Sequence, residues 1–173
     1  MDFWFSPVGA DPDHVATDVI RMMLAFKPPF YALGLSTPNR YQMAKNDRLC
    51  VYATLQGGGP GGIVADATVE ESPEDWRLAQ GIHEFIKPKG QPRTDALLRP
   101  LWEYLDKSVH ARQFPIVVLL RDVHEYIARP ICVTPELHAG LDSYALAPDL
   151  GLYVSATKRI TERDFGILTG RHG

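Results

Sequence analysis

The sequence predicts an α+β fold in which a bent, mostly antiparallel β-barrel is flanked by helices. Apolar residues alternate or run continuously over short segments that turn-forming residues separate, which is typical of consecutive strands in a barrel. Other segments carry apolar residues at helical spacing, one near the N-terminus and one near the C-terminus. The expected strands cover residues 2–7, 48–54, 63–69, 114–127 and 151–156.

Length and composition favour one globular domain over residues 1–173. Hydrophobic residues make up 45% of the chain and charged residues 23%, so the chain can bury a real core. The formal net charge of −3 argues against coating a long nucleic-acid backbone, but it allows a local basic patch or recognition of one base. The sequence has no apolar run of about 18 residues, so we expect no membrane partner.

The cysteines and the N-terminus indicate a cytoplasmic protein. Cys50 and Cys132 lie in apolar runs and lack metal-ligand spacing, so we expect buried free thiols in a reducing compartment. The N-terminus lacks a charged segment followed by an apolar one, which argues against a signal peptide. The six histidines show no ligand spacing, and we expect neither a metal nor a cofactor.

The first strand is rich in aromatic residues, and Pro7 ends it. Because side chains alternate in a strand, Trp4 points to the face opposite Phe3 and Phe5. Trp4 is either a core residue or the floor of a pocket at the end of the strand.

Two segments predict helices that flank the barrel. Asp13 is a suitable N-cap for a helix over residues 14–26, whose apolar side chains form one stripe. A capping-box-like start at Thr161 predicts a final helix, with Phe165 among the residues that pack inward.

The segment 30–40 combines aromatic residues with a polar turn. Phe30 and Tyr31 form an aromatic couple, and Gly34 separates it from the turn Ser36–Arg40. We expect a loop that offers ring faces, hydroxyls, an amide and a guanidinium together. This set suits a flat, hydrogen-bonding ligand better than it suits proton transfer. The alternative is a turn whose aromatic side chains fill the core.

A hairpin follows, in which strands 48–54 and 63–69 are joined by a glycine-rich turn. The turn contains the spacing GxGxxG over Gly57–Gly62. A dinucleotide-binding loop must open a helix, whereas a strand pattern follows here, so we reject that interpretation.

An insertion is expected between the hairpin and the strongest strand, at about 76–112. It begins near Trp76, contains a helix over 96–108, and should be most mobile at its tip, 85–95. The strand that follows begins at about 114 and is apolar enough to be buried on both faces.

Catalytic motifs are missing from the sequence. No GxSxG element is present, and neither cysteine lies in a recognisable nucleophile motif. We therefore do not expect an enzyme.

A series of motifs follows in a fixed order along the chain. They are the aromatic strand with Trp4, Phe30–Gly34, Thr37–Arg40, Lys45–Asp47 before Leu49–Tyr52, Gly62–Ala65, Pro115–Leu120 and Arg159–Phe165. In these motifs the sequence resembles the EVE domain family, which belongs to the PUA-like superfamily and is related to YTH domains. The sequence departs from the family at Tyr31, where a tryptophan is usual, and at Asn46, where the family's turn has glycine.

The resemblance implies a PUA-like barrel with a pocket between barrel and helix, and a role in recognising modified bases, notably modified cytosine in DNA. A base is read by taking it out of the stack, sandwiching it between rings and hydrogen-bonding its edge. The implied ring walls are Trp4, Tyr31 and Trp76, and Ser36, Thr37 and Asn39 would contact the base edge while Arg40 meets a phosphate. The implied partner is DNA or RNA that carries a modified cytosine or adenine.

Other classes of function stay open. The chain could bind a free small planar molecule, which the negative net charge favours over a long nucleic-acid footprint. It could also be a protein-interaction module that uses an exposed apolar patch, or an enzyme whose catalytic residues converge without a local sequence signature. Salt dependence separates the first alternative from a nucleic-acid reader, because phosphate contacts weaken steeply with salt.

Overall fold

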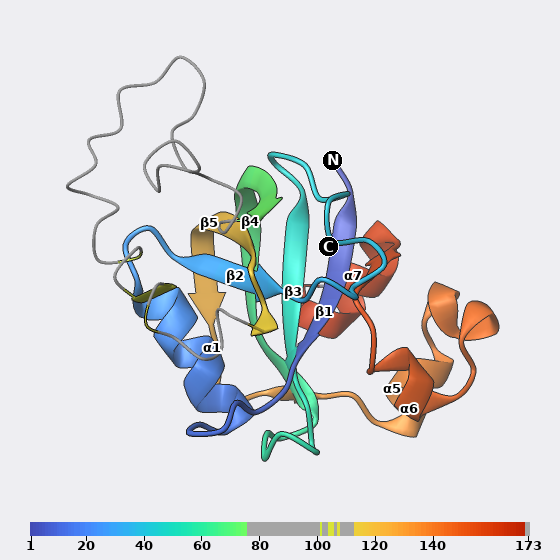
Figure 1. The fold of residues 1–173 in the computed structure, drawn as a ribbon. Coiled ribbons are helices and arrows are strands. Elements are labelled where there is room, and N and C mark those ends of the chain that lie inside the picture. Colours follow the sequence, from blue (N-terminus) through green and yellow to red (C-terminus); the bar gives the residue numbers. More distant parts are fainter. Residues whose placement is uncertain (76–100, 102–103, 106, 108–112, 172–173) are drawn as a thin grey trace.

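The computed structural model describes residues 1–75, 101, 104–105, 107 and 113–171 (Figure 1). The tip of the predicted insertion and Trp76 lie outside the described residues, as does most of the helix predicted over 96–108. Helices flank a curled sheet in the described part of the chain, which confirms an α+β fold.

Seven strands of the described chain form one sheet, which curls like half of a barrel (Figure 1). The strand order is β2-β5-β4-β3-β1-β7, and β6 pairs with β4 beside this path. Strands β1 and β3 run parallel, and the other neighbours in the described chain run antiparallel. Since β2 and β7 end the path, strand pairing among these residues leaves the barrel open. The strands are β1 (Phe3–Val8), β2 (Phe30–Leu33), β3 (Arg48–Ala53), β4 (Gly62–Asp75), β5 (Ile116–Glu125), β6 (Ile131–Cys132) and β7 (Lys158–Ile160).

Helices cover both faces of the sheet. Helix α1 packs against β1, β2 and β3, and α7 packs on the other face against β1, β3 and β4 (Figure 1). No helix within the described ranges is long and apolar enough to cross a membrane. The helices are α1 (Ala16–Ala25), α5 (Pro135–Ala139), the 3₁₀ helix η1 (Asp142–Leu146), α6 (Leu150–Tyr153) and α7 (Glu162–Thr169).

The alternation of side chains along β1 divides the core in two. Trp4 is buried in the cluster under α1, whereas Phe5 is buried in the cluster under α7. Tyr31 joins the first cluster and Cys50 the second. The predicted opposite orientation of Trp4 and Phe5 is confirmed.

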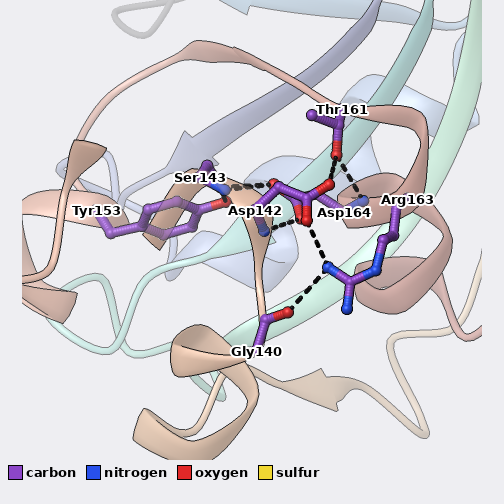
Figure 2. Close-up of polar contacts among 7 residues, drawn as sticks. All are labelled: Gly140, Asp142, Ser143, Tyr153, Thr161, Arg163 and Asp164. Atoms are coloured by element: carbon purple, nitrogen blue, oxygen red, sulfur yellow. Dashed lines mark hydrogen bonds and ion pairs between the residues drawn. The ribbon is translucent and has the colours of Figure 1, made fainter. Parts of the chain in front are cut away.

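The final helix begins in a dense polar network (Figure 2). The Thr161 hydroxyl accepts a hydrogen bond from the Asp164 amide at 3.0 Å, which is the predicted cap. The buried Asp164 carboxylate accepts from the backbone amides of Asp142 and Ser143, at 2.6 and 3.0 Å, and from the Ser143 hydroxyl at 2.7 Å. Because Arg163 also pairs with Asp142, this network fixes the segment between α5 and α7 and is structural.

Several local predictions were wrong for identifiable reasons. Asp13 does not cap α1, since Val15 is the N-cap residue and makes no side-chain cap bond. The Asp11 carboxylate instead accepts from the amides of Asp13 and His14, and this turn leads the chain into the helix. Cys132 is exposed rather than buried, because its strand β6 is short and lies beside the main path of the sheet.

Two strand predictions also need correction. Residues 151–156 are not a strand, because the Asp149 side chain caps α6 by accepting from the Leu152 amide at 2.8 Å. The late strand is β7, which begins after this segment. Conversely, the start of the segment 30–40 is not a loop, because residues 30–33 pair with β5 as strand β2.

Candidate functional site

The predicted ligand-binding turn belongs to the connection between β2 and β3, residues 34–47, here called the 34–47 loop. It leaves β2 at the edge of the sheet and returns to β3 in the middle (Figure 1). Short backbone hydrogen bonds fold it into successive turns, including Thr37 N to Gly34 O at 3.1 Å and Gln42 N to Asn39 O at 3.0 Å. The loop therefore has a defined backbone.

Asp47 fixes the end of the loop. Its carboxylate accepts hydrogen bonds from the Asp2 amide at 2.7 Å, from Trp4 Nε1 at 2.9 Å and from the Ala44 amide at 2.9 Å. Burial acts to raise the pKa of this carboxyl, but the hydrogen bonds from Asp2, Ala44 and Trp4 outweigh burial, so the pKa lies below its usual value. The charged Asp47 carboxylate thus connects the first strand to the last turn of the loop.

A chain of buried hydroxyls lies beside the middle of the loop. The Tyr31 hydroxyl shares its proton between Ser6 Oγ and the Pro7 carbonyl oxygen, each at 2.9 Å. Ser6 Oγ and Thr157 Oγ1 are 2.6 Å apart. Residues from β2, from β1 and from the approach to β7 therefore meet in one polar cluster inside the core.

The loop reaches this cluster through Asn39. Its side-chain amide donates to the Thr157 carbonyl oxygen at 3.4 Å, a long hydrogen bond. Arg40 turns back on the loop and donates from Nη1 to the Thr37 carbonyl oxygen at 3.1 Å. Its guanidinium lies over the Tyr41 ring, 5.3 Å from the ring centroid, which is a cation–π geometry.

Most side chains of the loop point to solvent although its backbone is fixed. Ser36 is exposed, and Leu35 and Tyr41 have exposed fractions of 44% and 50%. Arg40 Nε is buried and has no hydrogen-bond partner among the described residues. A hydrogen-bonded backbone that carries exposed polar and aromatic side chains is typical of loops that bind ligands.

The predicted site residues are only partly brought together. Trp4 and Tyr31 are 0% and 1% exposed, so neither presents an open ring face in this structure. Ser36 is exposed, while Thr37, Asn39 and Arg40 are half-buried. Asn39 meets the hydroxyl cluster of Tyr31 through Thr157, and Arg40 contacts Thr37. Trp76 lies outside the described residues.

Sequence reasoning missed four residues of this region. Ser6 had a signal, because it shares a strand face with Trp4 in β1. Tyr41 and Asp47 also had one, since they directly follow the predicted turn and precede the predicted strand. Thr157 had none, because only the tertiary fold brings it to Ser6.

Two buried side chains of the core, the Tyr31 phenol and the Cys50 thiol, have raised pKa values. Burial raises the pKa of the Tyr31 hydroxyl, and it raises the pKa of the Cys50 thiol, which the nearby Asp66 carboxylate raises further. Both groups are therefore protonated and are poor nucleophiles. In the described ranges, no group of three or more histidine, cysteine, aspartate or glutamate side chains could hold a metal ion.

Comparisons with known proteins give information on the fold alone. No protein-family model and no curated protein matches the sequence. The NMR structure of Rpa0253 from Rhodopseudomonas palustris is similar to this chain, with a TM-score of 0.51 and 11% identity over 99% of this chain and 92% of that one. A crystal structure of a Pseudomonas putida protein has a TM-score of 0.49 and 12% identity over 98% of both chains. Both were structural genomics targets.

Proposed function

We propose that this chain is a PUA-like, EVE-type binding module that recognises a modified nucleobase in DNA or RNA through the 34–47 loop. One observation carries the proposal. The loop backbone is fixed at Asp47 and contacted through Asn39, while the Tyr41 ring and Ser36 are exposed and the half-buried Arg40 guanidinium lies over the Tyr41 ring. This is the set of groups that a flat base with an attached phosphate requires.

Each group has a definite task in this proposal. The half-exposed Tyr41 ring supplies a stacking surface, and stacking contributes about 1–3 kcal/mol per base. Ser36, Thr37 and the Asn39 side-chain oxygen, which the contact with Thr157 does not use, hydrogen-bond the edge of the base. Arg40 has no acidic partner among the described residues, so its charge is left for a phosphate.

Trp4 and Tyr31 act as positioning residues. Trp4 donates a hydrogen bond to Asp47 at the end of the loop. Tyr31 donates to Ser6 in the hydroxyl cluster, which includes Thr157, the residue that Asn39 contacts. Their role is to fix where the exposed groups lie, which lowers the entropic cost of binding. This role differs from that of ring walls, and it explains why both rings are buried.

The proposed partner and location follow from the same chemistry. The partner is a nucleic acid with a modified cytosine or adenine, contacted over a short footprint because the net charge is −3. Cys50 and Cys132 are both free thiols, which is consistent with the cytoplasm.

The test is a calorimetric titration of short single strands and nucleosides with modified and unmodified cytosine or adenine. Tyr41→Ala should weaken nucleoside binding by about 1–3 kcal/mol. Arg40→Ala should weaken the oligonucleotide more than the nucleoside and should reduce the salt dependence by about one phosphate contact. Arg21→Ala is the matched control, because Arg21 is an exposed arginine on α1 that pairs with Asp18.

The outcomes separate the candidate functions. Oligonucleotide binding that Arg40→Ala and Arg21→Ala reduce equally would remove the 34–47 loop from the interface. Nucleoside binding that does not respond to salt, without added affinity for the oligonucleotide, would identify a reader of free planar molecules. No binding of any probe at millimolar concentration would refute a base reader.

A further inference from the structure

A buried carboxylate lies close to two arginines and a histidine on the α7 side of the sheet. Asp66 is fully buried on β4. Its Oδ1 lies 2.7 Å from an Nη of Arg48 and 3.5 Å from Nδ1 of His124, and its Oδ2 lies 3.1 Å from an Nη of Arg171. These side chains come from β3, from β5 and from the residue that follows the cap of α7.

The charge in this cluster is not balanced. Two guanidinium groups face one carboxylate, so the cluster keeps at least one positive charge whatever the state of His124. The other arginine pairs of the described residues differ, because Arg21, Arg159 and Arg163 each have their own carboxylate and Arg121 has two. Although the chain has a net charge of −3, this cluster is locally positive, which favours the binding of an anion.

The sheet and α7 hold the cluster in a fixed geometry. Cys50, Asp66 and His124 are direct neighbours on β3, β4 and β5, so their side chains share one face. The Arg48 guanidinium lies over the Phe165 ring at 5.3 Å. Arg171 is fixed because its amide donates to the Gly166 carbonyl oxygen at 2.9 Å, directly after the left-handed Gly170.

Several polar atoms of the cluster lack a hydrogen-bond partner. Arg48 Nε, the Tyr126 hydroxyl and Asp66 Oδ2 are buried and have no such partner among the described residues, so Arg171 contacts Asp66 Oδ2 as an ion pair without hydrogen-bond geometry. Burial raises the pKa of Tyr126 and the Asp66 carboxylate raises it further, while Arg171 and Arg48 act in the opposite direction, so the phenol keeps its proton. The side chains of Arg171 and His124 are 42% and 54% exposed, so the cluster has a side that is open to solvent.

We propose that Arg48 and Arg171, oriented by Asp66, form a phosphate-binding subsite. Each guanidinium contacts Asp66 through a single Nη, so each has further N–H groups, and guanidinium N–H groups match the geometry of phosphate oxygens. The phosphate comes either from the backbone of the nucleic acid of the proposed function, on which that part of the inference rests, or from a free phosphate ligand.

The first experiment uses inorganic phosphate alone. Titration at constant ionic strength, followed by the NMR shifts of the arginine Nε–Hε groups, should show saturable shifts at Arg171 and Arg48. Arg171→Gln should weaken phosphate binding about tenfold, whereas Arg159→Gln should leave it within about twofold. Arg159 is the matched control because it is 54% exposed and pairs with Asp2. Equal effects of the two substitutions, or shifts that do not saturate, would overturn the subsite.

Folding is monitored so that a loss of binding can be interpreted. Arg171→Gln leaves Asp66 paired with Arg48, so the fold should persist, and Arg171→Lys should restore part of the affinity because it restores the charge. If both variants are folded and Arg171→Lys binds phosphate no better than Arg171→Gln, the positive charge at this position does not contribute to phosphate binding. That result would refute the proposed subsite.

The second experiment uses the oligonucleotide and separates the two sources of phosphate. If Arg171→Gln weakens the oligonucleotide and inorganic phosphate alike, the subsite contacts the nucleic-acid backbone. If it weakens inorganic phosphate while the wild-type protein binds no oligonucleotide, the subsite stands and the proposed function fails. If it changes neither while the oligonucleotide binds, the subsite fails and the proposed function stands.

Discussion

The Trp4 indole donates its Nε1 hydrogen to Asp47 Oδ2 over 2.9 Å, and so connects β1 to the residue that precedes β3. The two residues are 43 positions apart in the sequence, and both are buried. This contact combines a large apolar ring with a charged acceptor. It therefore fixes the end of the 34–47 loop in a way that an apolar contact alone cannot.

Trp4→Phe keeps an aromatic ring in the core and removes this hydrogen bond. We expect a loss of about 2–4 kcal/mol in the free energy of unfolding, because a hydrogen bond to a charged group contributes about 1.5–3 kcal/mol and the smaller ring leaves a cavity. Urea denaturation measures the loss. Asp47→Asn in the Trp4→Phe background should then cost less than Asp47→Asn alone, and strict additivity of the two changes would contradict the contact.

The pH dependence of stability should reflect Asp47. Its folded pKa lies below the usual value of an aspartate, so the unfolded chain takes up the proton first as the pH falls. The stabilisation is therefore complete above the unfolded pKa of about 4 and is lost as the pH falls through the lower folded pKa. Acid denaturation of wild type and Asp47→Asn should converge below that range. A difference between them that persists unchanged into strong acid would contradict the assignment.

Tyr31→Phe removes one hydroxyl from the buried cluster and leaves Ser6 bonded to Thr157. The Pro7 carbonyl oxygen loses its donor from Tyr31, so we expect a destabilisation of about 1–2 kcal/mol. Tyr41→Phe is the matched control, because Tyr41 is half exposed and should change stability by less than about 0.5 kcal/mol. If urea denaturation gives the same small loss in the free energy of unfolding for both substitutions, the Tyr31 hydroxyl does not stabilise the fold.

The buried charge of Lys158 should destabilise the protein at neutral pH, and this destabilisation should decrease as the pH rises and the lysine loses its proton. Its ammonium lies 4.0 Å from the Tyr153 ring centroid and 4.8 Å from that of Phe5, and it has no hydrogen-bond partner among the described residues. Burial lowers the pKa of Lys158 to about 8, although the nearby Cys50 acts to raise it.

The sign follows from the number of bound protons. Between a folded pKa of about 8 and the usual lysine pKa of 10.5, the unfolded chain binds more protons at this lysine, so stability rises with pH across this interval. Lys158→Met should remove this rise and should be more stable than wild type below pH 8. The comparison must be made between the two proteins, because the raised pKa of Cys50 gives a contribution of opposite sign. Parallel pH profiles would refute the prediction.

The sequence predicted the parts of the fold that depend on neighbours along the chain. The glycine-rich turn joins β3 to β4 as expected, and the Thr161 cap starts α7. Both could be predicted because turns and caps depend on a few adjacent residues. The short strands β2 and β7 were missed, since three or four residues carry no periodicity and their pairing depends on distant partners.

The candidate site was predictable to a similar extent. The turn after Tyr31 stood out because rings, hydroxyls and a cation occur together in it, and the structure has a connecting loop there from residue 34 on. Sequence spacing could not show that Tyr31 is buried or that Thr157 meets Ser6, because both depend on how β1 lies between β3 and β7. The gathering of Arg48 and Arg171 around Asp66 depends on the same tertiary arrangement.

The position of β1 between β3 and β7 has a consequence for the newly made chain. β1 leaves the ribosome long before residues 158–160, which form one of its two neighbouring strands. Until those residues emerge, one edge of β1 exposes unpaired backbone N–H and C=O groups that can pair with another chain. Folding should therefore finish only after nearly the whole described chain has been synthesised, and aggregation should be most frequent just before that point.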